Sequence, residues 1–109
     1  MKNSLPEQPI TNLPQGTDIK RYSVLYLLQE QYCHTGCITY LQAQALLEGM
    51  SAETGQTPVG IYDAKTELFE WEPDRKLLYN QASIGEQGKR AEEMIRIVQE
   101  LRLHDSNNQ

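Results

Sequence analysis

Both cysteines of the chain and one of its two histidines fall within the stretch QYCHTGC, residues 31–37. Zn²⁺ binds cysteine and histidine side chains and takes four ligands in structural sites. Cys33, His34 and Cys37 supply three, and the second histidine, His104, lies in a polar C-terminal tail. A closed site would therefore need His104 or ligands from a second copy. We assign no metal ligand and no cofactor to this sequence.

Cys33 and Cys37 could instead form a redox pair. If 33–37 is a hairpin turn in which Gly36 adopts a positive φ, the two cysteines are cross-strand neighbours close enough for a disulfide. Three residues separate them, whereas the thioredoxin-like motif C-x-x-C has two. A thiol-dependent redox protein is therefore an alternative to two semi-buried thiols that flank a turn.

The negative charge of the chain is concentrated in its middle. Residues 48–74 hold seven carboxylates and one lysine, a local net charge of -6, while the whole chain carries -5. The seven are Glu48, Glu53, Asp63, Glu67, Glu70, Glu72 and Asp74. Binding to a phosphate backbone needs clustered lysine and arginine. This charge distribution argues against nucleic acid as a partner.

Residues 58–71, PVGIYDAKTELFEW, have the pattern of a β-hairpin. Residues 63–66 fit a type I turn that begins with aspartate. In the second strand the aromatic residues at 69 and 71 alternate with Glu70 and Glu72, which is typical of a half-buried strand. The alternating glutamates indicate a solvated face more readily than a catalytic carboxylate pair, which would need burial to separate the two pKa values.

The exposed rim of this hairpin is the predicted interaction face. We place Tyr62, Lys65, Glu70 and Glu72 on it. Tyrosine is enriched at protein interfaces, and the chain contains six tyrosines in 109 residues. The expected partner is another protein or a second copy of the chain, with a homodimer as one possibility.

The remaining elements come from apolar periodicity. Residues 21–29, RYSVLYLLQ, are apolar on both alternating faces, which favours a strand buried on both sides over a helix at 19–32. A capping box of Thr39 and Gln42 starts a helix expected over residues 40–53, and Ser83 with Glu86 starts another that reaches residue 103. Residues 76–80, KLLYN, are a candidate last strand.

The predicted fold class is α+β, a small antiparallel sheet in the order β-β-α-β-β-β-α with two helices packed on one face. Residues 18–103 form the single domain. Residues 1–17 are a disordered or extended N-terminal arm, rich in proline, and residues 104–109 are a disordered tail.

Composition and motifs restrict the function. The sequence contains no G-x-S-x-G, no glycine-rich phosphate loop and no H-E-x-x-H, and a histidine-based triad would have to use His34. No run is long and apolar enough to span a membrane, and no secretory signal is evident, so we expect a cytoplasmic location. We expect a non-enzymatic protein that acts through protein–protein interaction or self-association. A winged-helix DNA-binding regulator, with helices at 19–32, 39–50 and 59–71, is a further alternative.

Overall fold

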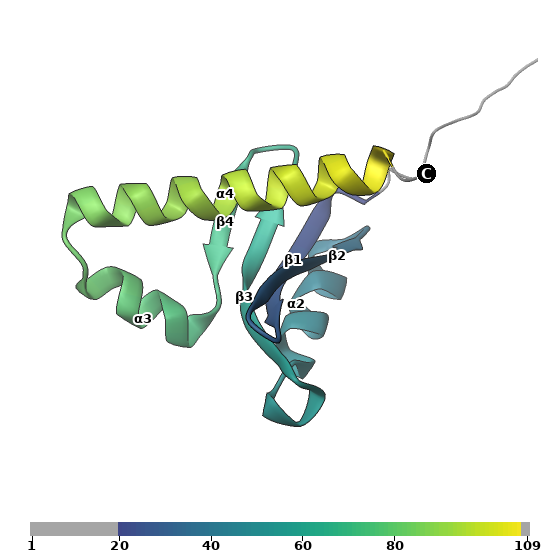
Figure 1. The fold of residues 1–109 in the computed structure, drawn as a ribbon, viewed down its shortest axis with the longest axis horizontal. Helices are drawn as coiled ribbons and strands as arrows, with labels where there is room; N and C mark the ends of the chain where they lie inside the picture. Colours follow the sequence, from purple (N-terminus) through teal and green to yellow (C-terminus); the bar gives the residue numbers. More distant parts are fainter. Residues whose placement is uncertain (1–19, 108–109) are drawn as a thin grey trace, which may run out of the picture.

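The computed structural model describes residues 20–107, and the predicted N-terminal arm at 1–17 lies outside this range. The described part folds into one antiparallel sheet with three helices packed against it (Figure 1). The sheet order is β2 (Gln31–Cys37), β1 (Tyr22–Leu28), β3 (Gln56–Asp63), β4 (Leu68–Trp71). The predicted α+β class with an antiparallel sheet is confirmed. The winged-helix alternative is wrong, because two of its three helices are strands.

The two central strands explain why the sheet is covered on both faces. Val24 and Leu25 are neighbours in β1 and therefore point to opposite faces, and both are completely buried. Val24 packs with Ala43 and Leu47 of α2 (Tyr40–Gly49). Leu25 packs with residues of α4 (Ile84–Asn107).

The prediction that both helices share one face is thus wrong. A strand that is apolar on both alternating faces needs cover on both sides, and one helix supplies each cover.

A helix replaces the predicted strand at residues 76–80. This helix, α3, spans Pro73–Gln81, and the Glu72 carboxylate caps it by accepting a hydrogen bond from the Arg75 amide. Proline at the first helical position is a helix-start signal as well as a turn signal. The pair Pro73-Asp74 therefore starts a helix here, and the sheet has no fifth strand within the described residues.

The first hairpin turns earlier than predicted. Gln29 and Glu30 connect β1 to β2, and both have positive φ values of 52° and 67°. These residues form the two-residue turn without the usual glycine or asparagine, which is why the sequence pattern missed it. Gly36 lies within β2 instead, where a Cβ would be 2.8 Å from the Lys20 side chain. Gly36 therefore lies beside the Lys20 side chain and does not form the turn.

The helix starts are confirmed and the helix ends differ. The Thr39–Gln42 capping box is formed, and the Ser83 hydroxyl accepts a hydrogen bond from the Glu86 amide. Helix α2 ends at Gly49, four residues early, and a separate 3-10 turn follows at Ala52–Thr54. Helix α4 continues to Asn107, through residues that were predicted to form a disordered tail.

Candidate functional site

A groove lies beside β4, at one edge of the sheet. Its volume is about 580 Å³, and its walls come from β4, α3 and parts of β1, α2, β3 and α4. Five aromatic side chains line it together with three charged ones. The lining residues are Tyr22, Tyr40, Ile61, Asp63, Thr66, Leu68, Phe69, Glu70, Trp71, Lys76, Tyr79 and Ala91. Aromatic side chains are thus the largest group in the groove, which also holds two carboxylates and one ammonium group.

The backbone of β4 presents unpaired polar groups at this edge. The Glu72 amide donates to the Val59 carbonyl, so residues 72 and 59 form a hydrogen-bonded pair. Hydrogen-bonded pairs alternate with non-hydrogen-bonded pairs along an antiparallel ladder, so residues 70 and 61 also form a hydrogen-bonded pair. The N–H and C=O groups of Phe69 and Trp71 therefore point away from β3. They have no backbone partner within the described part of the chain, where β4 is an edge strand. Such an edge can accept an added strand.

Glu70 is the carboxylate at the centre of this edge strand. The Tyr40 hydroxyl, at the start of α2, donates to both of its oxygens at 2.7 and 2.8 Å. The hydrogen bond to Glu70 raises the pKa of Tyr40 above its usual value. Glu70 is exposed, and no cation lies within ion-pair distance of it among the described residues. Its negative charge is therefore available to a ligand.

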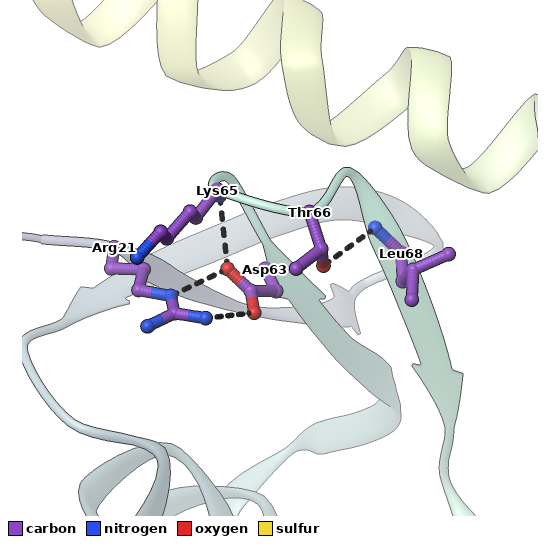
Figure 2. A network of polar contacts seen from close by, with 5 residues as sticks. All are labelled: Arg21, Asp63, Lys65, Thr66 and Leu68. Carbon is purple, nitrogen blue, oxygen red and sulfur yellow. Dashed lines mark hydrogen bonds and ion pairs between the residues drawn. The ribbon is translucent and has the colours of Figure 1, made fainter.

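Asp63 closes one end of the groove, where the β3–β4 loop begins. The Arg21 guanidinium donates two hydrogen bonds of 2.7 Å to its two oxygens, and the Lys65 amide donates a third (Figure 2). The bidentate contact with Arg21 is the main reason that the pKa of Asp63 falls from 3.8 to about 2. Asp63 is thus neutralised by the protein itself and fastens the loop to β1.

Aromatic contacts fix the wall of the groove. The Trp71 ring lies 5.2 Å from Phe69, edge to face, and 5.0 Å from Tyr79 of α3. Phe69 in turn lies over Gly60, where a Cβ would be 2.5 Å from its ring. Glycine at this position leaves room for the ring and for the Glu70 carbonyl oxygen.

The four predicted interaction residues occupy different environments. Tyr62 is buried against α4, where its hydroxyl accepts a hydrogen bond from Gln99, so it is not part of any surface. Lys65 is exposed in the β3–β4 loop, Glu70 lies in the groove, and Glu72 caps α3. The structure therefore brings only one of the four into the groove. The predicted alternation of aromatic and acidic residues along β4 is confirmed.

The strand geometry of β2 keeps the side chains of Cys33, His34 and Cys37 apart. Cys33 and Cys37 lie four residues apart on the same face of β2, which corresponds to roughly 13 Å of extended chain, and both thiols are free. A disulfide needs Cα atoms within about 7 Å, so they cannot bond in this fold. Burial raises the pKa of the Cys37 thiol. His34 points to the opposite face, and no three metal-ligating side chains cluster within the described residues.

A serine, a histidine and an aspartate do come together on the α4 face. The Ser23 hydroxyl lies 3.2 Å from His34 Nδ1, and His34 Nε2 contacts the Asp105 carboxylate. Arg102 donates a hydrogen bond of 2.7 Å to the same hydroxyl. The order Ser–His–Asp is that of a catalytic triad, but the serine and the aspartate contact the opposite ring nitrogens.

This cluster lacks the access that a nucleophile needs. Ser23 is 0 % exposed, beneath α4, so no substrate carbonyl can reach its oxygen. Arg102 also donates to the backbone carbonyl of Lys20. The cluster therefore fastens the C-terminal half of α4 to β1 and β2. Sequence reasoning missed it because the Ser23–His34, His34–Asp105 and Ser23–Arg102 contacts join residues that are 11, 71 and 79 positions apart in the chain.

Comparison with known proteins gives no relative: no family model matches the sequence, and neither curated proteins nor solved structures match it. No helix within residues 20–107 is both long and apolar enough to cross a membrane.

Proposed function

We propose that this protein is a non-enzymatic binding module that takes up an extended, basic segment of a partner protein along β4. The observation that carries the proposal is the free edge of β4, where the outward N–H and C=O groups of Phe69 and Trp71 meet the groove. Recognition by strand addition uses such groups for affinity and neighbouring side-chain pockets for specificity.

The charge of the edge selects the partner. Glu70 lies at the middle of β4, and Glu67 and Glu72 flank the strand. A lysine or arginine opposite Glu70 would point to the same face as Glu70 and form a charge-assisted contact with it, and its aliphatic stem could pack on the Tyr40 ring. A second copy of β4 would instead place like charges opposite each other, which opposes pairing between two copies at this edge.

Glu70→Lys is the variant that tests this proposal. Glu72 is left unchanged because its carboxylate caps α3, and its loss would disturb the wall of the groove. The matched control is Glu53→Lys, which makes the same charge change at an exposed residue of the 3-10 turn, outside the groove.

The probe is a display library of random peptides, selected on the full chain, followed by calorimetry with one enriched peptide. We expect enriched peptides to be basic, and we expect Glu70→Lys to weaken binding about tenfold or more while Glu53→Lys binds like the unchanged protein. Equal binding by both variants, or enrichment of peptides without basic residues, would contradict the proposal.

A further inference from the structure

Helix α3 contributes no residue to the two hydrophobic clusters that flank the sheet. None of its nine residues is buried, and its aromatic contact is that of Tyr79 with Trp71. Its Leu77 is 63 % exposed, and Ile84, just beyond it at the start of α4, is 87 % exposed. Isolated helices of this length are marginal in water and owe most of their stability to packing of an apolar face. A helix of nine residues with none buried would therefore be stabilised if Leu77 and Ile84 were covered.

The surface belongs to an arm that projects past β4 (Figure 1). We call residues 73–93 the helical arm; it comprises α3, its connection to α4 and the first ten residues of α4. The arm carries four carboxylates and four cationic side chains, a net charge of zero in a chain of net charge -5. These are Asp74, Glu86, Glu92 and Glu93, with Arg75, Lys76, Lys89 and Arg90.

Most of these charges have no partner within the arm. Arg90 and Glu86 form the one ion pair that joins two arm residues, at 3.3 Å. Three cations and three carboxylates of the arm remain without an ion pair among the described residues. The arm thus offers equal numbers of both charge signs beside exposed apolar side chains.

We propose that the helical arm binds the helical arm of a second copy of this chain across a twofold axis. In such an interface each side chain occurs twice, so the cations of one arm can face the carboxylates of the other while Leu77 and Ile84 become buried. Outside the arm the sequence carries the whole net charge of -5, so two copies repel each other apart from the arms. Lys76, Tyr79 and Ala91 of the arm also line the proposed peptide groove, whereas Leu77 and Ile84 do not.

Sedimentation equilibrium of the full chain over a range of concentrations tests this proposal. The arm variant is Leu77→Gln with Ile84→Gln, which keeps the charge, and glutamine is a good helix former. The matched control is Leu41→Gln with Leu103→Gln, at helix residues that are 75 % and 64 % exposed outside the arm. We expect a dimer whose dissociation constant rises about a hundredfold or more in the arm variant and stays unchanged in the control.

A second variant distinguishes a weakened interface from an unfolded α3 helix. Lys89→Glu leaves every apolar side chain in place and gives the arm a net charge of -2, so it should also weaken the dimer. The proposal is overturned if the unchanged chain sediments as a monomer at all concentrations up to the millimolar range. It is also overturned if the control weakens the dimer as much as the arm variant does, or if Lys89→Glu has no effect. Peptide binding at β4 should survive the arm variant, so the two proposals can fail separately.

Discussion

Replacing Asp63 by asparagine should remove an acid-sensitive part of the stability of this fold. The Arg21 guanidinium holds the Asp63 carboxylate in two hydrogen bonds of 2.7 Å, and the pKa falls from 3.8 to about 2. At 1.36 kcal/mol per pKa unit, this difference of 1.8 corresponds to about 2.4 kcal/mol. The Asp63 side chain is 19 % exposed and Arg21 is more so, and solvent screening therefore reduces the expected contribution to about 1–2 kcal/mol.

The pH dependence follows from the direction of the change. The pKa of Asp63 is lower in the folded chain than in the unfolded chain, so the folded state is stabilised while the carboxylate is ionised. This contribution is fully present above the unfolded pKa of 3.8 and is lost as the pH falls through about 2. Asparagine at position 63 keeps an oxygen that can accept from the Lys65 amide but carries no charge.

Urea denaturation at several pH values measures the effect. At pH 7 the Asp63→Asn variant should be less stable than the unchanged chain by about 1–2 kcal/mol, and the two should converge near pH 2. Glu53→Gln is the control, because it removes an exposed carboxylate that has no ion pair among the described residues. A constant difference between Asp63→Asn and the unchanged chain at every pH would refute the ionic explanation.

Two further predictions concern single side chains. Glu70→Gln should lower the pKa of Tyr40 toward its usual value, which a spectrophotometric titration of tyrosine would detect; an unchanged titration would show that the Tyr40–Glu70 hydrogen bond is not formed. Mild oxidation of the folded chain should produce no disulfide between Cys33 and Cys37, and Cys37 should react slowly with a thiol reagent because it is buried; mass spectrometry that finds the internal disulfide would contradict the strand geometry of β2.

Sequence patterns identified the elements whose signals are local. The alternating apolar faces of β1, the Thr39 capping box of α2 and the apolar stripe of α4 each depend on residues close together in the chain. Position 73 shows the limit of such signals, since proline is equally suited to a turn and to the first turn of a helix. The two-residue turn at Gln29 and Glu30 lacked any glycine or asparagine to mark it.

The candidate site depends on contacts that no local pattern contains. Tyr40 meets Glu70 across 30 residues, and Arg21 meets Asp63 across 42 residues. The Arg21–Asp63 pair follows from the sheet order, in which β1 and β3 are neighbours although β2 and α2 lie between them in sequence. The alternation in β4 correctly placed Glu70 on the face opposite Phe69 and Trp71, but the burial of Tyr62 required knowledge that α4 covers the other face of the sheet.

Amide hydrogen exchange at β4 tests the central claim most directly. In the free protein the amides of Phe69 and Trp71 should exchange fast, because they point away from β3, while the Glu70 amide is protected by its pair with Ile61. Addition of an enriched basic peptide should protect Phe69 and Trp71. Fast exchange at both amides in the saturated complex would contradict the account.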